Sequence, residues 1–155
     1  EDVLVDDTDP GFVREGPAAY WTSVSSGYPT YAPHSWWTRN LTTKPAGKPG
    51  DNWATWTPWI QGEGCYQVEA YIPPHYYWGT SAAQYTINHR DGQTGPIIVD
   101  QWNNPDSWVD LGAFIFAYGN GGSVQLTDVT GEAYITRWIA FDAVRWTYQG
   151  ATCSP

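Results

Sequence analysis

Short apolar segments separated by turn residues run along the whole chain, and within them apolar and polar positions alternate with the period of two that is typical of β-strands. The clearest is Tyr66–Ile72, in which every second residue is apolar on one face, while Gln67 and Glu69 lie on the other. Pro73 and Pro74 end this segment. Helical periodicity is nearly absent, so the pattern indicates an all-β fold.

The same pattern predicts eight further strands, at Val3–Asp6, Tyr20–Val24, Trp53–Trp59, Gln84–His89, Ile97–Gln101, Trp108–Ala117, Ser123–Thr127 and Tyr134–Thr147. This number of strands in one chain indicates two packed antiparallel sheets, which is a β-sandwich. Two turn-rich segments, Arg90–Gly92 and Gly119–Gly122, predict tight hairpin connections, because Asp, Asn and Gly tolerate the positive φ that such turns require.

The 155 residues are expected to form a single domain, 1–155, because this length suits one hydrophobic core and the chain shows no internal repeat. Three stretches do not fit the strand pattern: a long insertion rich in Trp and Tyr at about residues 25–51, the segment Pro73–Ala83, and the segment Trp102–Ser107. A tail, 148–155, follows the last predicted strand. Long ordered loops on a rigid sandwich are where function usually lies.

The charge balance excludes two classes of partner. Sixteen acidic residues against seven basic ones give a formal net charge of -9, which repels nucleic-acid phosphates and anionic membrane surfaces. No apolar run approaches the roughly 18 residues of a membrane-spanning helix. We therefore expect no nucleic-acid partner and no membrane insertion.

Cysteine occurs twice, at Cys65 and Cys153, which are too far apart for a CxxC redox or zinc motif. Either the two residues form a disulfide, or both are buried free thiols of a cytosolic protein. In an acidic chain rich in Trp, Tyr, Gly and Pro we favour the disulfide, and hence an oxidising, extracellular location. A bridge that closes roughly ninety residues would stabilise the fold by about 4 kcal/mol.

Six motifs follow one another along the chain: Val3–Phe12, Ala54–Pro58, Gly64–Pro73, Tyr85–Gly92, Trp108–Gly112 and Ala140–Trp146. In this order they resemble the golvesin C-terminal-like domain, also called the xanthan-lyase-associated or cell-wall-associated β-domain. The resemblance implies a jelly-roll-like antiparallel β-sandwich, similar to galactose-binding domains and carbohydrate-binding modules. It also implies a non-catalytic accessory module, of the kind appended to secreted bacterial polysaccharide lyases, peptidoglycan hydrolases and proteases. The insertion at 25–51 and the two cysteines are not part of the family's pattern.

The excess of aromatic residues is the strongest functional signal, because the chain has 11 Trp and 11 Tyr. Sugar rings present apolar C–H faces that stack on Trp and Tyr, and nearby polar side chains fix the hydroxyl groups. The aromatic residues of the predicted loops are therefore candidate glycan ligands: Trp36, Trp37, Tyr76, Tyr77, Trp78 and Trp102. Any one of them can instead be packed structurally, as we expect for Trp56, Trp138 and Trp146 within the strands.

The carboxylates of Asp6, Asp7 and Asp142 form a candidate calcium site. Asp6, Asp7 and Asp9 flank the first predicted strand and Asp142 lies in the last, and these two strands are commonly neighbours in a jelly roll. Ca²⁺ takes about six to eight hard oxygen ligands, and similar carbohydrate-binding folds often hold a structural calcium near these strands. The structural alternative is that Asp9-Pro10-Gly11 is only a turn and that Asp142 either pairs with Arg145 or caps backbone N–H groups.

No catalytic motif is present. The histidines are His34, His75 and His89, and the sequence lacks an HExxH motif, a GxSxG elbow and a Cys–His pair. Two carboxylates for glycoside cleavage would have to be recognised by their separation in space. We therefore expect that the chain is not an enzyme.

A glycosylation sequon occurs at Asn40-Leu41-Thr42. It has meaning only in a host with the eukaryotic pathway. If the resemblance holds and the source is bacterial, the sequon is accidental.

These features favour a secreted attachment module that binds polysaccharide or cell-wall glycan through loop aromatics. The alternative is a structural subunit or repeat of an extracellular filament, surface layer or adhesin. Such a subunit would associate with copies of itself through aromatic loops, or by addition of a terminal strand such as Val3–Asp6 to a neighbour's sheet. Trp and Tyr are also enriched at protein interfaces, so composition alone leaves both functions open.

Overall fold

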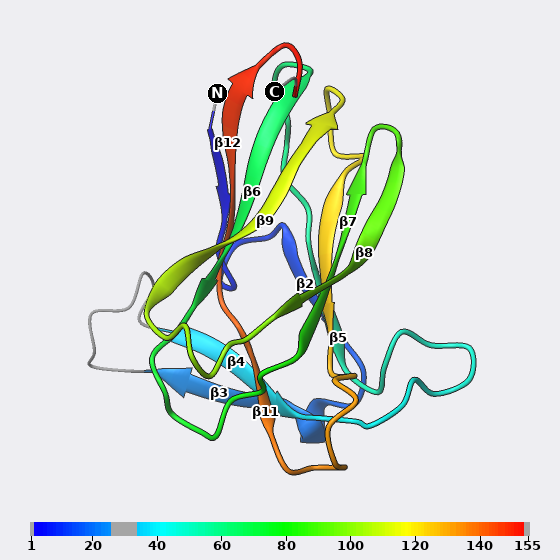
Figure 1. Cartoon of the computed structure of the whole chain (residues 1–155), viewed down its shortest axis with the longest axis vertical. Helices are drawn as coiled ribbons and strands as arrows, with labels where there is room; N and C mark the ends of the chain where they lie inside the picture. The colour runs from blue at the N-terminus through cyan, green and yellow to red at the C-terminus, as the bar shows by residue number, and fades with distance from the viewer. Residues whose placement is uncertain (1, 26–33, 154–155) are drawn as a thin grey trace.

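The computed structural model describes residues 2–25 and 34–153 of the chain. In this part the chain forms β-strands and one short 3-10 helix, η1 (Figure 1). In chain order these elements are β1 (Val3–Val5), β2 (Phe12–Glu15), η1 (Ala18–Tyr20), β3 (Thr22–Ser25), β4 (His34–Arg39), β5 (Trp53–Trp56), β6 (Gly64–Ile72), β7 (Ala83–His89), β8 (Gly92–Val99), β9 (Ser107–Phe116), β10 (Ser123–Thr127), β11 (Trp138–Phe141) and β12 (Val144–Gly150). None of the helical structure in these residues has the length and apolar character needed to cross a bilayer.

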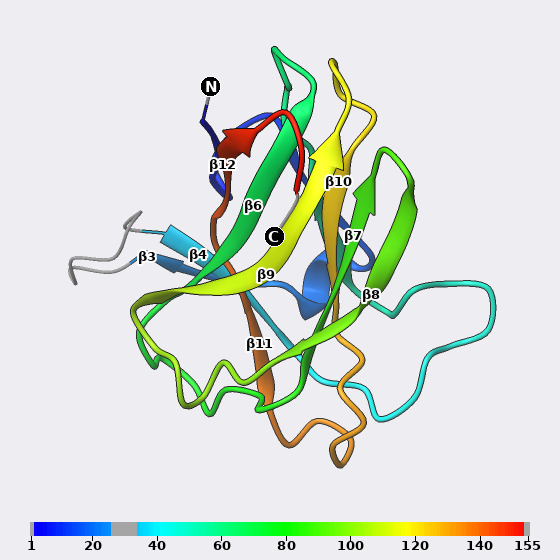
Figure 2. The ribbon, with the colours of Figure 1, turned by 45° about the horizontal axis from the view of Figure 1, so that its top comes forward.

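The strands form three antiparallel sheets. The first has the order β1-β12-β6-β9 and the second the order β2-β5-β10-β7-β8, and together they make the sandwich (Figure 1, Figure 2). The third sheet, β11-β4-β3, crosses one end of the sandwich, at the bottom of Figure 1. Both ends of the described chain lie at the opposite end of the sandwich, so the third sheet closes the sandwich away from them.

Large aromatic side chains build the core between the first two sheets. β6 is buried along most of its length, because β12 and β9 pair with it on both sides. Trp146 of β12 is fully buried and meets Phe116 of β9 edge to face, with ring centroids 6.3 Å apart. From the second sheet, Trp56 is fully buried and its ring lies 5.1 Å from that of Phe12. Each fully buried side chain of this size contributes up to about 3 kcal/mol to stability.

The structure confirms the antiparallel all-β sandwich and the core positions of Trp56 and Trp146. The hairpin predicted at Arg90–Gly92 joins β7 to β8, with His89 and Gly92 as its last pair. Gly92 has a φ of 131°, in the region that favours glycine. Local turn chemistry was therefore sufficient to predict this connection.

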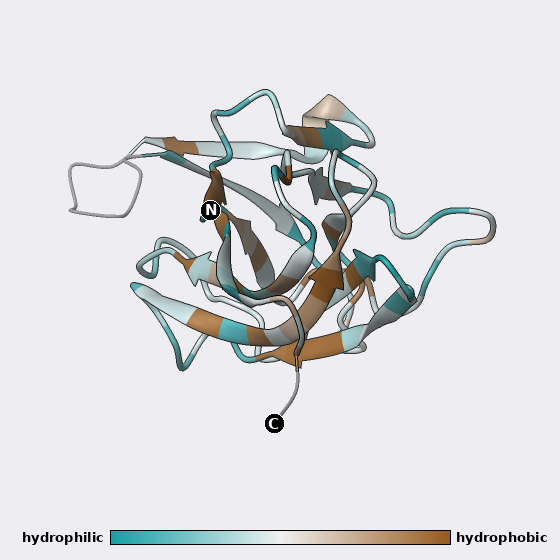
Figure 3. Ribbon diagram, turned by 90° about the horizontal axis from the view of Figure 1, so that it is seen from above, coloured by the Kyte–Doolittle hydropathy of each residue, from teal (hydrophilic) through white to brown (hydrophobic). Residues whose placement is uncertain are grey.

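The insertion at residues 25–51 is not a loop throughout, because His34–Arg39 forms β4, the middle strand of the third sheet. Residues 26–33 of the insertion lie outside the described residues. The remainder, between β4 and β5, extends to the side of the sandwich and is mostly hydrophilic (Figure 1, Figure 3). β4 is only six residues long and lies among Gly, Pro and Ser residues that are typical of loops, so the sequence pattern did not predict a strand there.

Two further expectations are wrong because the chain changes sheets where one element was predicted. Tyr134–Thr147 is not one strand: β11 belongs to the third sheet and β12 to the first, and the crossing falls at Asp142 and Ala143. Gly119–Gly122 is not a hairpin, because β9 belongs to the first sheet and β10 to the second. A pattern of apolar residues does not show to which sheet a segment belongs.

The predicted disulfide joins Cys65 to Cys153, across 88 residues of sequence. Cys65 is buried near the start of β6, while Cys153 follows β12 in the expected tail, 148–155, whose first residues still belong to β12. The bond therefore holds the residues after β12 against the beginning of an inner strand of the first sheet.

We expect that the double variant Cys65→Ala, Cys153→Ala loses about 4 kcal/mol of unfolding free energy, since the bond restricts a long segment of the unfolded chain. Equilibrium denaturation in urea measures the change. The single variant Cys153→Ala serves as a second test and should lose a similar amount. A loss below about 1 kcal/mol in both variants would contradict the entropic account.

Candidate functional site

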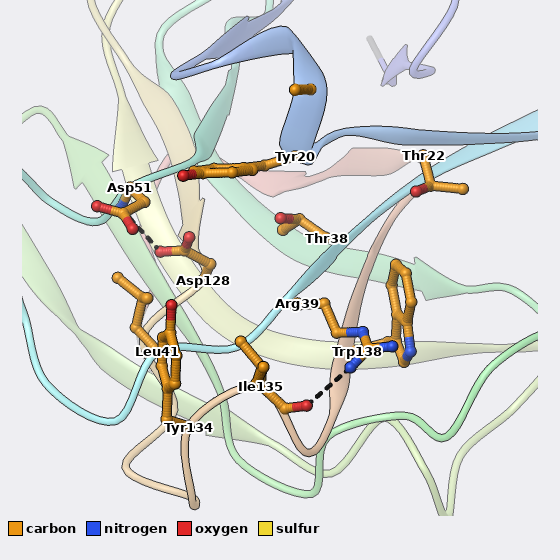
Figure 4. Close-up of a pocket in the computed structure, with 11 residues that line it drawn as sticks. Tyr20, Thr22, Thr38, Arg39, Leu41, Asp51, Asp128, Tyr134, Ile135 and Trp138 are labelled. Carbon is orange, nitrogen blue, oxygen red and sulfur yellow. Dashed lines mark hydrogen bonds between the residues drawn. The ribbon is translucent and has the colours of Figure 1, made fainter.

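A groove lies where the third sheet meets η1 and the connections that precede β5 and β11, at the end of the sandwich away from the termini (Figure 4). Its volume is about 240 Å³. The groove is lined by Ala19, Tyr20, Thr22, Thr38, Arg39, Leu41, Asp51, Asp128, Tyr134, Ile135 and Trp138. Residues that are far apart in the sequence thus form one surface.

Large apolar side chains in the groove are exposed. Tyr20 is 54% exposed, Tyr134 62% and Ile135 46%. Tyr20 and Tyr134 lie on opposite sides in Figure 4. A local concentration of exposed apolar surface is typical of a binding site rather than of a solvated face.

Ile135 has a φ of 51°, which β-branched residues rarely adopt. Its N–H donates to the carbonyl of Asn40 at 3.0 Å, and its own carbonyl accepts from the guanidinium of Arg39 at 2.9 Å. Backbone strain of this kind costs about 1–3 kcal/mol and persists only where the surroundings impose it. The loop 130–137 therefore presents Tyr134 and Ile135 at the groove at a cost in stability.

Asn40 is fully buried and anchors this loop. Its side-chain amide donates to Thr130 Oγ1 and to the carbonyls of Glu132 and Ala133, at 3.0, 3.2 and 3.1 Å. Its Oδ1 accepts from the N–H of Arg137 at 2.9 Å. The amide nitrogen that glycosylation would modify is thus inside the protein, and the sequon at this position has a structural role.

Glu132 connects the same loop to the segment that follows β6. Its carboxylate accepts from the Thr80 hydroxyl, and from the N–H and the hydroxyl of Ser81 at 3.2 and 3.0 Å. Burial opposes the charged form, but these hydrogen bonds outweigh it and hold the pKa of Glu132 below its usual value. The loop is therefore held from two sides.

Asp51 and Asp128 form an acidic end of the groove, near Tyr20 in Figure 4. Asp128 is buried, and its carboxylate accepts the backbone N–H groups of Asp51 and Asn52 at 3.2 and 2.9 Å. Burial nevertheless raises the pKa of Asp128 to about 6. Carboxylate oxygens at this end are suited to accept hydrogen bonds from hydroxyl groups.

Trp36 and Trp37, predicted as loop ligands, belong to β4 instead. Trp37 is buried, and its ring meets those of Tyr76 and Tyr77 edge to face, with centroids 6.3 and 5.4 Å away. Trp36 packs against the core beside Trp21. The expectation of a loop platform at these two residues is wrong, because the alternation of β4 directs them to opposite faces of the third sheet and both faces are covered.

The other four predicted aromatics lie in connections, as expected, but none lines the groove. Tyr77 stacks on Trp138 with centroids 4.3 Å apart, and Tyr76 contacts Trp37. Trp102 stacks on His75 at 4.0 Å. Trp78 is exposed, and the guanidinium carbon of Arg137 lies over its ring, 3.8 Å from the ring centroid. A binding role for Trp78 stays a prediction.

Trp138, expected in the core, is only partly buried and lines the groove. Sequence reasoning also missed Tyr20 and Tyr134, which fell at the starts of predicted strands. The turn-rich residues Thr130-Gly131-Glu132 before Tyr134 could have indicated a loop there. Nothing in the sequence around Asn40 indicated that its side chain is fully buried and anchors the loop 130–137.

A carboxylate cluster of Asp6, Asp7 and Asp142 lies between the first and last strands, as predicted from their positions in the sequence. One carboxylate oxygen of each residue lies within 4.8 Å of the others. Among the described residues, both side-chain oxygens of Asp142 and one each of Asp6 and Asp7 are buried without a hydrogen-bond partner. Burial and then the neighbouring carboxylates raise the pKa of Asp7 to about 8 and that of Asp142 to about 10.

A divalent cation fits this cluster. Hard, buried and unpaired carboxylate oxygens are the ligands that Ca²⁺ prefers, and a cation would compensate their charge. The ion pair between Asp142 and Arg145, which was one structural alternative to a metal site, is not formed. Arg145 instead pairs with Glu69 at 2.8 Å. The turn at Asp9 does form, with Asp9 Oδ2 accepting the N–H of Asp6 at 2.8 Å.

His34 supports Asp7 from outside the cluster. Its Nδ1 contacts Asp7 Oδ2, and its Nε2 lies 2.7 Å from the hydroxyl of Ser23. Burial lowers the pKa of His34, which favours a neutral ring that donates to Asp7 and accepts from Ser23. The order of these groups is that of serine hydrolases, but there the carboxylate serves the imidazole. Asp7 is also a member of the carboxylate cluster, so the contact with His34 restrains the orientation of one of the cluster's carboxylates.

The fold and the groove define a class: a jelly-roll-like antiparallel β-sandwich with an aromatic groove at one end. The family model described as the golvesin C-terminal domain matches residues 3–148. The chain belongs to this family, which confirms the resemblance found in its motifs.

Xanthan lyase of Bacillus sp. (strain GL1) is 30% identical over 150 residues, which cover 96% of this chain but only 15% of the lyase. The solved structure of Paenibacillus xanthan lyase has a TM-score of 0.78 and 24% identity, over 96% of this chain and 13% of that one. The exo-β-1,3-galactanase of Phanerochaete chrysosporium, solved with galactose, has a TM-score of 0.54 and 13% identity. The match covers 94% of this chain and 29% of the galactanase. The structural likenesses show a shared fold.

We expect that Asn40→Asp lowers the free energy of unfolding by about 3 kcal/mol, because it removes the donated hydrogen bonds and buries a charge against two carbonyls. Urea denaturation measures the loss. Thr42→Val is the matched control: it removes one exposed hydrogen bond to the Glu132 carbonyl in the same sequon and should cost below about 1 kcal/mol. Equal losses in the two variants would contradict the anchoring role of Asn40.

Proposed function

We propose that this chain is a non-catalytic module that binds polysaccharide in the groove at the end of the third sheet. The observation that carries the proposal is the loop that holds Tyr134 and Ile135 exposed beside Tyr20. The exposed apolar surface and the positive φ of Ile135 both lower stability. A protein retains such a feature where a ligand uses it.

The chemistry of the groove matches that of a sugar chain. The C–H faces of sugar rings can stack on Tyr20, Tyr134 and Trp138, as aromatic side chains do in ligand sites. Asp51 and Asp128 can accept hydrogen bonds from hydroxyl groups. In this proposal Tyr77 acts indirectly, by stacking on Trp138.

Two observations support an accessory role outside the cell. The related sequence occupies 15% of the Bacillus xanthan lyase, where it is one part of a much longer enzyme. The disulfide between Cys65 and Cys153 is of a kind that persists in oxidising compartments. We infer that the chain attaches a secreted protein to a polysaccharide or to cell-wall glycan.

We also propose that the carboxylate cluster holds a structural Ca²⁺. The ion would join the residues after β1 to the start of β12 through Asp6, Asp7 and Asp142. It would relieve the mutual repulsion that accompanies burial of these groups. The cluster comes from different elements than the groove, so we assign it to stability and not to glycan contact.

Self-association is a second candidate function, favoured by Trp59 and Tyr118. Both are exposed, and their rings meet edge to face at 5.4 Å. Reciprocal backbone hydrogen bonds between Ile60 and Gly119 join the connection after β5, which carries Trp59, to the connection after β9, which carries Tyr118. Light scattering on the purified protein tests this candidate, since a monomer at all concentrations would exclude it.

We expect that Tyr20→Ala and Tyr134→Ala each weaken polysaccharide binding at least about tenfold, a loss of about 1.4 kcal/mol. Both side chains are exposed, so the unfolding free energy should change by less than about 1 kcal/mol. Retention on insoluble peptidoglycan, cellulose and chitin and affinity electrophoresis in xanthan measure binding. Trp59→Ala is the matched control.

The groove proposal fails if Trp59→Ala alone abolishes retention, because the contact surface would then include Trp59. It also fails if the wild-type protein binds none of the polymers and forms oligomers, which would favour a structural subunit.

The calcium proposal predicts a pH dependence with a definite sign. The pKa values of Asp7 and Asp142 are raised on folding, so without metal these two groups favour the folded state most below about pH 4, and this contribution is lost as pH rises toward about 8 to 10. Ca²⁺ competes with these protons, so it should raise the unfolding temperature more at about pH 8 than at about pH 5. At a concentration of 100 Kd it stabilises by about 2.7 kcal/mol.

Differential scanning calorimetry with Ca²⁺, with Mg²⁺ and with chelator checks this expectation. Asp142→Asn should abolish the calcium effect, while Glu63→Gln, which changes the charge at an exposed ion pair, should preserve it. An unfolding temperature that is unaffected by Ca²⁺ at either pH would rule out the metal site.

A further inference from the structure

Arg39 occupies a defined place in the wall of the groove. It pairs across the strands with Trp138, and its guanidinium carbon lies over the Trp138 ring, 4.7 Å from the centroid. One Nη donates to the Ile135 carbonyl at 2.9 Å. The side chain is therefore held in one orientation before any ligand arrives, which reduces the entropy that binding must remove.

Arg39 also differs from most other arginines of this acidic chain. Arg90 pairs with Glu63 and Asp91, Arg137 with Glu132, and Arg145 with Glu69. Within residues 2–25 and 34–153, no carboxylate lies within ion-pair distance of Arg39. Its guanidinium has five N–H groups, of which the Ile135 carbonyl accepts one, so donors remain for a ligand.

The end of the groove opposite Arg39 carries negative charge. Figure 4 shows Asp51 and Asp128 on one side and Arg39 with Trp138 on the other. The Asp128 oxygens already accept two backbone N–H groups. A ligand lying along the groove would meet acceptors for hydroxyl groups at one end and an unpaired cation at the other.

We propose that the groove selects glycans that carry a carboxylate, as uronic acids do, and that Arg39 binds this carboxylate. The guanidinium is planar and can donate two parallel hydrogen bonds to a carboxylate, which gives both affinity and orientation. The neutral part of the glycan then stacks between Tyr20 and Tyr134, with hydroxyl groups toward Asp51 and Asp128. This inference rests on the proposed glycan-binding function and adds the class of ligand to it.

A matched pair of ligands tests the proposal: xanthan oligosaccharides that contain glucuronate, and the same oligosaccharides after chemical reduction of the carboxyl groups. Isothermal titration calorimetry with the wild-type protein should show binding of the native form at least about tenfold tighter than of the reduced form. Arg39→Gln should abolish this preference but retain binding of the reduced form. Arg90→Gln, which removes the same charge at an exposed hairpin, should preserve the preference.

The outcomes separate this inference from the function on which it rests. Equal binding of native and reduced oligosaccharides by the wild-type protein would overturn the carboxylate preference and leave glycan binding intact. Absence of binding to either form would count against both. If Arg39→Gln weakens both ligands equally, Arg39 acts by holding Ile135 in place, and the carboxylate contact is wrong.

Arg39→Lys provides a second variant that keeps the charge. It loses the planar donor pair and should retain only part of the preference. The preference should also fall as salt is added, because an exposed ion pair is screened. A preference that is full in Arg39→Lys and independent of salt would overturn the proposed contact.

Discussion

The buried hydrogen bond from the Trp56 indole nitrogen to the main-chain carbonyl of Asp142, 3.1 Å long, holds the point where the chain passes from the third sheet to the first. Residues before this point form β11, which contributes Trp138 to the groove, and residues after it form β12, which pairs with β1. The crossing leaves the Asp142 carboxylate in the interior beside Asp7. The groove and the carboxylate cluster therefore both depend on where this single backbone group is held.

Several aromatic residues of this chain form cation–π contacts with guanidinium groups, a role that composition alone does not indicate. Arg14 lies over Trp36, Arg39 over Trp138 and Arg145 over Trp108, at 3.5, 4.7 and 4.1 Å from the ring centroids. A ring holds a cation without neutralising its charge, whereas a carboxylate partner would do so. In a chain with a net charge of -9, this allows a positive group to persist at the groove.

The extent to which this molecule could be predicted from its sequence follows from the range of the interactions involved. Alternation located most strands, and the neighbouring first and last strands of a jelly roll brought Asp6, Asp7 and Asp142 together as expected. Trp37, expected in a loop, is buried on the middle strand of the third sheet, whereas Trp138, expected in the core, lies on an edge strand of that sheet and lines the groove. Asn40 bonds to residues about ninety positions away, and no local pattern reports such contacts.

The two ends of the described chain lie side by side: the Asp2 carboxylate accepts the N–H of Tyr148 at 3.0 Å, and β1 pairs with β12. The groove is at the other end of the long axis (Figure 1). Any polypeptide joined to either end of the described chain would thus leave from a common base, far from the groove. In the proposed function, the sandwich would act as a rigid spacer between a domain joined at this base and a polysaccharide held in the groove.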